Sequence, residues 1–259
     1  MSKLNGKRVW LTGASLGIGR GLALELASCG AIIVITSRNE DALDVVRREV
    51  ESRGGKALVK PGDVTDLDRM KAIASEIESE IGGVDILIAN AGTHVFTQPE
   101  EFDTAEYLDL MDINYGGTLR CIEAILPGML VRKSGQIVGI ASLTGLRGVP
   151  MAAAYGASKG AIINFLQSIR FDLQEHNIGV TIVNPGFVRT PLTDKNDFHM
   201  PFLIEPEKAA RIICSAIARE RNEISFPIPF SWTIRLLRVL PDLIYNRIMK
   251  RVWRRMKNN

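Results

Sequence analysis

Short apolar runs alternate with longer amphipathic stretches along most of the chain, and this alternation constrains the fold more than any other feature. The runs are apolar throughout rather than at every second position, which is typical of strands buried on both faces. They lie at Arg8–Leu11, Ala31–Thr36, Ala57–Lys60, Val84–Ala89, Gln136–Ile140 and Gly179–Asn184, with a weaker one at Glu223–Phe226. Helical periodicity fills the intervals, at about 18–29, 39–53, 66–81, 104–132, 155–176 and 206–220. This order predicts right-handed βαβ units and a doubly wound parallel α/β sheet.

The composition indicates one large domain followed by a distinct extension. The chain has 259 residues, 46% of them hydrophobic and 24% charged, which suits a single α/β domain with an ample core. We assign residues 1–226 to this domain and residues 227–259 to a C-terminal extension. Residues 187–205 contain two prolines and no clear period, and they predict a long loop that covers a ligand crevice.

The N-terminal residues and the cysteines favour a cytoplasmic protein. Residues 1–7 contain no apolar segment, so we expect no signal peptide. No apolar run reaches the roughly 18 residues that a membrane-spanning helix needs. Cys29, Cys121 and Cys214 are an odd and scattered set, which favours reduced thiols that fill the core.

A glycine-rich turn, Thr12-Gly13-Ala14-Ser15-Leu16-Gly17-Ile18-Gly19-Arg20, directly follows the first predicted strand. Gly13 can make the tight turn, Gly17 leaves the backbone open to a pyrophosphate, and Gly19 lets the next helix pack close to the sheet. Free N–H groups and the dipole at the start of that helix attract an anion. A glycine turn by itself is also compatible with a purely structural role. Its position between the first strand and the first helix is what favours a dinucleotide site.

The second predicted strand ends in Ser37-Arg38, where an NAD-binding site usually has a carboxylate that accepts the ribose 2′-hydroxyl. The Arg38 guanidinium suits a 2′-phosphate as a charge-assisted partner. These residues predict NADP, with NADPH preferred over NADH. The alternative is that Arg38 is a solvated loop arginine.

A tyrosine and a lysine share one face of a predicted helix in Tyr155-Gly156-Ala157-Ser158-Lys159. A nearby ammonium favours the phenolate, so we expect Lys159 to lower the pKa of Tyr155 and fit it for general acid–base work. Ser142, just past the fifth strand, can hold a substrate oxygen beside it. An isolated Tyr–Lys pair also occurs as a half-buried tyrosine with a solvated lysine. The combination with the glycine turn and the serine is what indicates catalysis.

Taken together, these residues resemble the short-chain dehydrogenase/reductase family over about residues 6–226. The family's motifs appear in order: Thr12–Gly19, Asp63-Val64, Asn90-Ala91-Gly92, Asn114, Ser142, Tyr155 with Lys159, and Pro185-Gly186 with Thr190. The resemblance implies a single Rossmann-type domain of about seven strands in the order 3-2-1-4-5-6-7. It also implies hydride transfer between NADP(H) and a ketone or secondary alcohol.

The resemblance implies a role for each matching residue. Tyr155 would exchange the proton, Ser142 would hold the substrate oxygen, and Lys159 would also bond the nicotinamide ribose. Asn114 would anchor a water in a proton relay, and Asn90 would help to hold the sheet. The implied cofactor-binding set is Thr12, Gly13, Ser15, Gly17, Ile18, Gly19, Ser37, Arg38, Asp63, Val64, Asn90, Ala91, Gly92, Tyr155, Lys159, Pro185, Gly186, Val188 and Thr190. Leu16 departs from the pattern, because NADP-using members often have a basic residue in the glycine turn.

The histidines show no spacing that suits a metal ion, and we predict no metal site. We interpret His94, His176 and His199 as surface or loop residues. His94 follows the Asn90–Gly92 motif and His199 lies in the covering loop, so both are also candidates for substrate contact.

The C-terminal extension is strongly basic, with eight Lys or Arg residues against Asp242 as its one acidic residue. Pro241 separates a short predicted helix at about 231–240 from a second one. In the second helix an apolar stripe has helical spacing and basic residues cover the other face; the stripe is Tyr245, Ile248, Met249, Val252, Trp253 and Met256. One interpretation is that residues 231–256 dock on an anionic membrane surface. The other is that the stripe packs on the protein's own body or on a second subunit.

The substrate and the assembly follow only in outline from the sequence. The covering loop contains Phe187, Leu192, Phe198, Met200, Pro201, Phe202 and Leu203, which favours a lipophilic carbonyl substrate. By family likeness we expect a homodimer or homotetramer through the helices at 104–132 and 155–176. The extension's continuous apolar stripe argues against nucleic acid as a partner. The alternative function is a catalytically idle dinucleotide-binding sensor or membrane-tethered scaffold.

Overall fold

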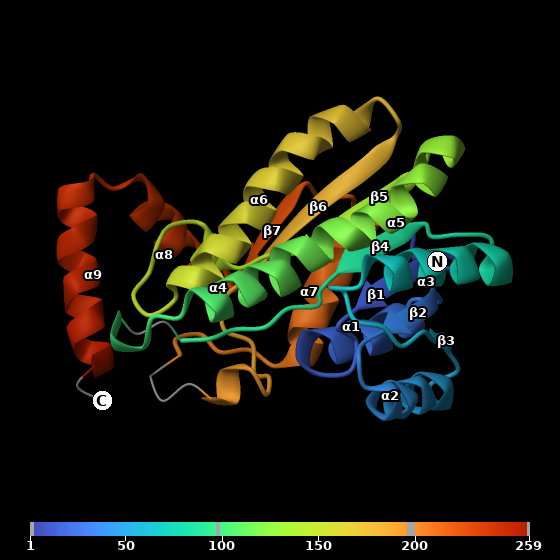
Figure 1. Cartoon of the computed structure of the whole chain (residues 1–259), viewed down its shortest axis with the longest axis horizontal. Helices are drawn as coiled ribbons and strands as arrows, with labels where there is room; N and C mark the ends of the chain where they lie inside the picture. Colours follow the sequence, from blue (N-terminus) through green and yellow to red (C-terminus); the bar gives the residue numbers. More distant parts are fainter. Residues whose placement is uncertain (1–2, 97–98, 196–199, 258–259) are drawn as a thin grey trace.

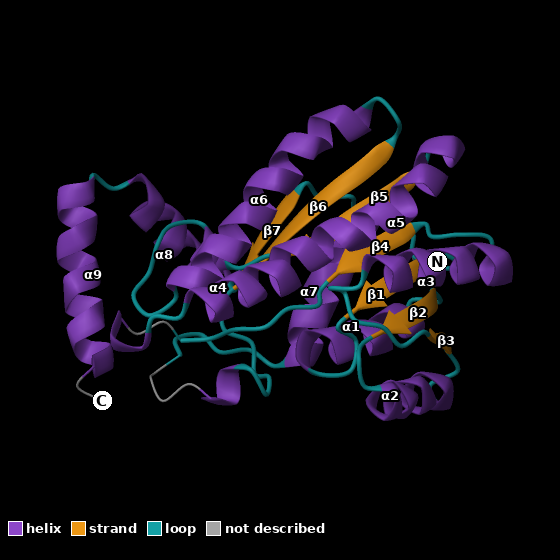
Figure 2. Cartoon of the chain, in the orientation of Figure 1, coloured by secondary structure: helices purple, strands orange, loops and turns teal. Residues whose placement is uncertain are grey.

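The computed structural model describes residues 3–96, 99–195 and 200–257, and a twisted parallel sheet forms its centre (Figures 1 and 2). Within these residues seven strands pair in parallel in the order β3-β2-β1-β4-β5-β6-β7. They are β1 (Arg8–Thr12), β2 (Ile32–Thr36), β3 (Lys56–Val59), β4 (Ile86–Ala89), β5 (Gly135–Ile140), β6 (Ile178–Pro185) and β7 (Glu223–Phe226). The predicted fold class and strand order are confirmed.

Helices cover both faces of the sheet (Figure 1). Their bounds are α1 (Gly17–Ser28), α2 (Glu40–Ser52), α3 (Leu67–Ile81), α4 (Thr104–Met111), α5 (Gly117–Arg132), α6 (Ala153–Gln174), α7 (Pro206–Ala218), α8 (Ile228–Val239) and α9 (Asp242–Lys257). Because strand side chains alternate, Val9 and Leu11 of β1 pack with α1, α2 and α7, whereas Trp10 packs with α3, α5 and α6. The sheet is therefore buried on both faces, which explains its uniformly apolar strands.

The long helix predicted at 104–132 is interrupted. A π-helical turn, η2 (Asp112–Gly116), separates α4 from α5 and carries Asn114. A Cβ at Gly117, directly after this turn, would lie 2.6 Å from Cγ2 of Val64. The glycine therefore lets the helix backbone pack closely against Val64, in the segment between β3 and α3. Such π turns are frequent at functional sites, because they redirect side chains without ending the helix.

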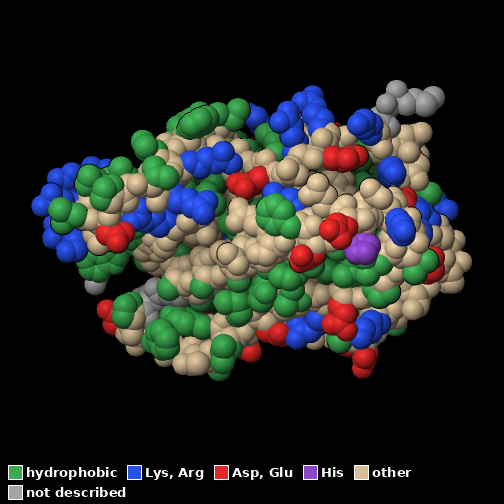
Figure 3. Space-filling view, turned by 90° about the horizontal axis from the view of Figure 1, so that it is seen from above, with side chains coloured by type: hydrophobic (Ala, Val, Ile, Leu, Met, Phe, Trp, Pro, Cys, Tyr) green, Lys and Arg blue, Asp and Glu red, His purple; other side chains and the backbone are tan. Residues whose placement is uncertain are grey.

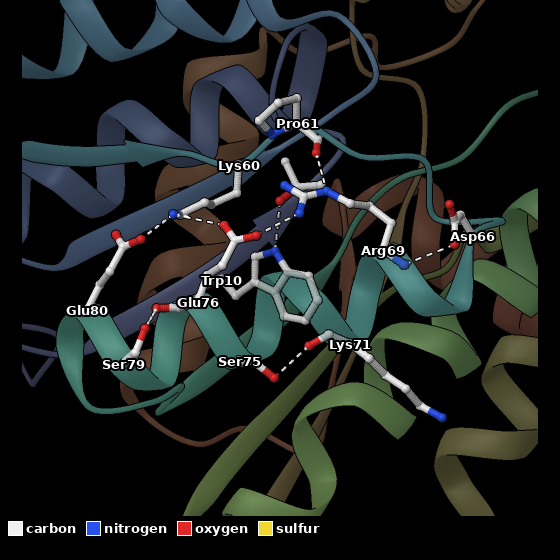
Figure 4. A network of polar contacts seen from close by, with 11 residues as sticks. Trp10, Lys60, Pro61, Asp66, Arg69, Lys71, Ser75, Glu76, Ser79 and Glu80 are labelled. Atoms are coloured by element: carbon white, nitrogen blue, oxygen red, sulfur yellow. Dashed lines mark hydrogen bonds and ion pairs between the residues drawn. The ribbon is translucent and has the colours of Figure 1, made fainter.

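A polar network holds α3 against the segment that follows β3 (Figure 4). Lys60 pairs with Glu76, at 2.9 Å, and with Glu80. Arg69 donates to the carbonyl of Pro61 at 2.8 Å and pairs with Glu76 at 2.7 Å. The network fixes the chain just before Gly62-Asp63-Val64, which are among the residues of the cleft described below.

Candidate functional site

A cleft of about 770 Å³ lies at the carboxyl ends of the central strands. This is the edge at which open α/β sheets bind ligands. The predicted site residues that line it are Gly13, Ser15, Gly17, Ile18, Gly19, Ser37, Arg38, Asp63, Val64, Asn90, Ala91, Gly92, Ser142, Tyr155, Lys159, Pro185, Gly186, Val188 and Thr190. Thr12 and Asn114 are fully buried beneath the lining instead. The fold therefore brings residues from seven separate segments of the sequence to one place.

The glycines of the turn between β1 and α1 are required by close backbone contacts. Gly13 has a φ of +65°, and a Cβ there would lie 2.7 Å from Cα of Ala91. A Cβ at Gly19 would lie 2.0 Å from the carbonyl oxygen of Gly13, so α1 can pack on the turn only without that atom. Gly17 has a φ of +52°, and its Cβ would meet the side chain of Thr190 at 2.7 Å. The expected roles of Gly13 and Gly19 fit this geometry, and Gly17 has a further reason in its contact with the covering loop.

The start of α1 fits a dinucleotide phosphate. The N-cap residue, Leu16, is extended, and within the described residues it makes no side-chain cap to the helix. The first turn of α1 also contains no acidic side chain. Its N–H groups and the positive end of the helix dipole thus face the glycine-lined cleft, which is the arrangement that binds phosphate groups.

Thr12 and Asn90 connect the glycine turn to the end of β4. The Thr12 hydroxyl accepts from the backbone N–H groups of Asn90 and Ala91 at 3.1 and 3.2 Å. The Asn90 side chain donates back to the carbonyls of Thr12 and Gly13, both at 3.0 Å. These bonds hold the floor of the cleft together, which is the role that the resemblance implies for Asn90.

Arg38 and Asp63 lie at the end of the cleft formed by β2 and β3. Arg38 is 77% exposed, and its guanidinium is 4.0 Å from the Asp63 carboxylate. Asp63 is oriented by Thr65, whose backbone N–H and hydroxyl donate to it at 3.0 and 2.9 Å. The guanidinium is therefore at the cleft edge and open to an anion.

Ser142 and Tyr155 meet across the middle of the cleft. Ser142 caps a short 3₁₀ turn, η3 (Leu143–Gly145), by accepting from the backbone N–H of Thr144 at 3.1 Å. A Cβ at Gly145 would lie 2.7 Å from the backbone of Lys159, so the glycine lets this turn pack directly on α6. The Ser142 and Tyr155 side chains are hydrogen-bonded to each other, which places two hydroxyls at one point of the cleft.

Lys159 is buried, and its side chain lies near the Tyr155 ring. Its Nζ donates to the carbonyl oxygen of Ile140 at 2.9 Å and lies 5.7 Å from the centre of the Tyr155 ring. Burial lowers the pKa of Lys159 to about 8. Burial also raises the pKa of Tyr155, with the hydrogen bond from Ser142 acting in the opposite direction.

The expectation that Lys159 lowers the Tyr155 pKa is wrong for this structure. Loss of water from around the phenolate outweighs the other influences on the phenol. The Lys159 ammonium is also directed at the Ile140 carbonyl. Tyr155 is therefore a protonated hydroxyl at neutral pH, which is the form that donates a proton.

The depressed lysine pKa has a consequence for stability. An unfolded lysine has a pKa of 10.5 and folded Lys159 one of about 8, so the unfolded chain binds more protons between these values. Stability should therefore rise with pH through this window, by about 3 kcal/mol from this group. We expect the wild type to gain stability over Lys159→Met between pH 8 and 10.5 in urea unfolding. Lys208→Met replaces an exposed lysine of α7, and its free energy of unfolding should differ from that of the wild type by the same amount at every pH in this window. A difference for Lys159→Met that also stayed constant would contradict the lowered pKa of Lys159.

Asn114 connects the π turn to the floor of the site. Its side-chain oxygen accepts from the backbone N–H of Thr93 at 2.7 Å, and its amide donates to the Thr93 carbonyl at 3.0 Å. The amide also donates to the Ser158 hydroxyl at 2.9 Å, which in turn donates to the Tyr155 carbonyl at 2.8 Å. Ser158 was not singled out from the sequence, although its position three residues after Tyr155 is the available signal. The role of Asn114 in a water relay stays a prediction.

The far wall of the cleft comes from the segment after β6. The Gly186 N–H donates to the carbonyl of Phe226 at 2.7 Å, and Val188 is buried and bridges to Ile204. Thr193, which the sequence did not single out, bonds both the backbone and the hydroxyl of Thr190. This loop is therefore held in shape by its own polar groups.

His94 is half-buried, and its ring lies against that of Tyr155. Its ring makes edge contacts with Tyr155 and Phe96, with centroids 4.8 and 4.7 Å apart, and burial lowers its pKa. His94 thus lies in a loop, as expected, and it remains a candidate for substrate contact. His176 is exposed, as expected, whereas His199 and Phe198 lie outside the described residues.

The buried cysteines have the environment expected of core-filling thiols. Cys121 and Cys214 are buried and Cys29 is half-buried. Burial raises the pKa of Cys121 to about 12. The described residues contain no cluster of His, Cys, Asp and Glu that could hold a metal ion.

Comparisons with known proteins agree with this geometry. The family model of the short chain dehydrogenases matches residues 7–200. An uncharacterized oxidoreductase from Myxococcus xanthus is 35% identical over 252 residues, which cover 97% of this chain and 100% of that protein. A fatty acyl-CoA reductase from Acinetobacter baylyi is 33% identical over 226 residues, which cover 86% of this chain and 76% of the other.

The chain is also similar to solved structures of short-chain dehydrogenases and oxidoreductases. A short-chain type dehydrogenase/reductase from Mycobacterium marinum has a TM-score of 0.81 at 30% identity, covering 86% of this chain and 94% of that one. A metagenomic short-chain oxidoreductase in complex with NADP has a TM-score of 0.75 at 32% identity, covering 87% of this chain and 98% of the other.

Proposed function

Because the chain belongs to the short-chain dehydrogenase/reductase family, we propose that it reduces a lipophilic carbonyl compound with NADPH. The observation that carries this proposal is the meeting of the Ser142 and Tyr155 hydroxyls in the cleft that the glycine turn opens. A nicotinamide cofactor, when bound, supplies the hydride. The glycine turn and the start of α1 would hold its phosphates, and Arg38 its 2′-phosphate.

The protein's own groups handle the substrate oxygen and the proton. The hydrogen-bonded Ser142 and Tyr155 hydroxyls hold a carbonyl oxygen between them and polarise it. Tyr155, protonated because its pKa is raised, donates its proton to that oxygen as the alcohol forms. Lys159, whose Nζ lies 5.7 Å from the centre of the Tyr155 ring, would bond the nicotinamide ribose. The reverse reaction would need the Tyr155 phenolate as its base.

An aromatic cluster beside the cleft supports a lipophilic substrate. Phe187 stacks on Phe230 with centroids 5.5 Å apart, and Phe202 lies 6.5 Å from Phe230. Both Gly186, which packs on Phe230, and Leu192 line the cleft. The similar protein from Acinetobacter baylyi acts, by its name, on fatty acyl-CoA, which agrees with a long apolar chain in such a cleft.

A cofactor-consumption assay tests the proposal. NADPH and NADH oxidation would be followed with ketones of graded chain length and ring number. We expect kcat/KM with NADPH to rise as the apolar part of the ketone grows and to exceed that with NADH. Turnover limited to short polar ketones would contradict the proposal of a lipophilic substrate. Equal kcat/KM with NADH and NADPH would contradict the proposed preference for NADPH.

Arg38 should decide the choice of cofactor. Replacing it by Asp removes the partner of the 2′-phosphate and places a carboxylate against it. We expect kcat/KM with NADPH to fall by about 10- to 100-fold, since bonds to charged groups are worth about 1.5–3 kcal/mol, while NADH is used as well or better. Arg48→Asp, which replaces an exposed arginine of α2, is the matched control. An unchanged NADPH preference in Arg38→Asp would leave Arg38 as a solvated loop residue.

A homodimer or homotetramer remains part of the proposal. Phe171 of α6 is 71% exposed, and α6 is one of the helices through which the family likeness implies association. Sedimentation of Phe171→Glu against the wild type would test this face, and an unchanged mass would exclude it.

A further inference from the structure

The C-terminal extension presents an apolar face on α8 that the rest of the described chain leaves uncovered. Ile228, Trp232, Leu236 and Val239 are 63–75% exposed. At spacings of four, four and three residues they lie on one side of the helix. Leu243 and Ile244, at the beginning of α9, are also exposed. This face differs from the stripe that the sequence emphasised.

The stripe on α9 turns partly toward the body. Tyr245 is buried, and its hydroxyl donates to the carbonyl of Gly148. Ile248 and Met249 are half-buried, Val252 and Trp253 are exposed, and the side chain of Met256 lies outside the described residues. The stripe's first half therefore packs on the protein itself, which is the second of the two interpretations that the sequence left open.

Basic side chains surround the exposed apolar face. Arg238 extends from α8, whereas Arg235 pairs with Glu223 of β7 at 3.2 Å. The outer side of α9 adds the exposed residues Arg247, Lys250, Arg251, Arg254 and Arg255. Figure 3 shows blue basic and green apolar side chains gathered together at the end of the molecule where α8 and α9 lie. Exposed aromatic and aliphatic groups beside Arg and Lys match a membrane interface, where acyl chains meet anionic headgroups.

Arg147 fixes the extension to the body. Its guanidinium donates to the carbonyls of Leu237, Arg238 and Leu240 at 2.7–3.0 Å. It also pairs with Asp242 at 2.5 Å and stacks 3.7 Å above the Tyr245 ring. One side chain thus satisfies the C-terminal carbonyls of α8 and holds the beginning of α9, so the two helices keep a set orientation.

The extension is also joined to both walls of the cleft. Arg147 belongs to the segment between Ser142 and Tyr155. Phe230, in the first turn of α8, packs on Gly186 and Phe187 of the opposite wall. Any surface that receives α8 is consequently held beside the substrate cleft.

We propose that α8 and α9 dock the protein on an anionic lipid bilayer, with Trp232 and Leu236 inserted among the acyl chains and the arginines of α9 on the headgroups. The match of charge and apolar surface selects this partner. Docking would supply a lipid-dissolved substrate directly to the cleft. No described helix is long and apolar enough to cross a membrane.

Sedimentation with sucrose-loaded vesicles tests the docking on the full chain. The vesicles would be phosphatidylcholine alone or with about one-third phosphatidylglycerol. We expect binding to the anionic vesicles that weakens at about 1 M salt, where the screening length falls to about 3 Å. Arg251→Gln with Arg254→Gln should weaken binding about 25-fold, since each basic residue near the surface contributes about fivefold. Trp232→Ser with Leu236→Ser should weaken it by at least about tenfold.

Matched controls separate this surface from general charge or hydrophobicity. Arg48→Gln with Arg211→Gln removes exposed charge elsewhere, and Val45→Ser with Val131→Ser removes exposed apolar side chains elsewhere; both pairs should bind as the wild type does. Turnover of a short, water-soluble ketone without vesicles should be unchanged in all four variants, so failure of docking and failure of the proposed reaction are distinguishable. Absent binding by the wild type, or binding that Trp232→Ser with Leu236→Ser leaves unchanged, overturns the proposal. If the wild type does not bind vesicles but self-associates, and Trp232→Ser with Leu236→Ser abolishes this self-association, the face is assigned to a second copy of the chain instead.

Discussion

Tyr155→Phe should lower kcat/KM for carbonyl reduction by about 10²- to 10⁴-fold, the range that a general acid contributes. The substitution removes the Tyr155 hydroxyl, which is hydrogen-bonded to Ser142, and keeps the ring that packs against His94. Because we propose that the phenol donates the proton, its loss should act on the chemical step. Steady-state kinetics with NADPH and a ketone would measure the loss, and NADPH titration by fluorescence should give a Kd close to that of the wild type.

Tyr115→Phe is the control for this experiment, since the Tyr115 ring packs on Phe165 outside the cleft lining. It should keep wild-type turnover. If Tyr155→Phe also kept wild-type turnover while NADPH still bound, Tyr155 would not be the acid. If the wild type bound NADPH but turned over none of the ketones, the alternative of a catalytically idle dinucleotide-binding protein would be favoured.

Gly19→Ala should disrupt cofactor binding and the fold around it. The added methyl would sit 2.0 Å from the Gly13 carbonyl oxygen and 2.7 Å from the Asn90 amide, where backbone atoms cannot move without separating α1 from β1. Overpacking of this kind costs about 1–3 kcal/mol or more, and it displaces the helix end that would hold the phosphates. We expect a Tm several degrees lower and NADPH affinity reduced by at least about tenfold.

Gly148→Ala adds the same atom where nothing lies within 4 Å, at a backbone conformation open to other residues. It should leave both Tm and NADPH affinity close to the wild-type values. Thermal unfolding with and without NADPH would measure both effects together. A Gly19→Ala protein with wild-type Tm and affinity would show that the turn relaxes, and that the close contact does not define the site.

The sequence determined the sheet and the composition of the site because both depend on local patterns. Strands that are apolar on both faces are buried between helices, and this pattern predicts the doubly wound class. The glycine turn was equally local, since a backbone at positive φ or in close contact excludes a side chain, as Gly13 and Gly19 do. Such patterns and the family resemblance were enough to predict Ser142, Tyr155 and seventeen other residues that line the cleft.

Only the tertiary structure decided what depends on burial and on distant partners. The pKa of Tyr155 is raised, against expectation, because desolvation follows from packing that no spacing of Tyr and Lys reveals. The sequence places His94 in a loop, and only the fold shows that its ring packs on that tyrosine. In the extension, periodicity found two helices but could not tell which side each would turn to solvent. Arg147, about 90 residues earlier in the chain, fixes that choice by capping α8 and holding Tyr245, and so leaves Trp232 rather than Tyr245 on the outside.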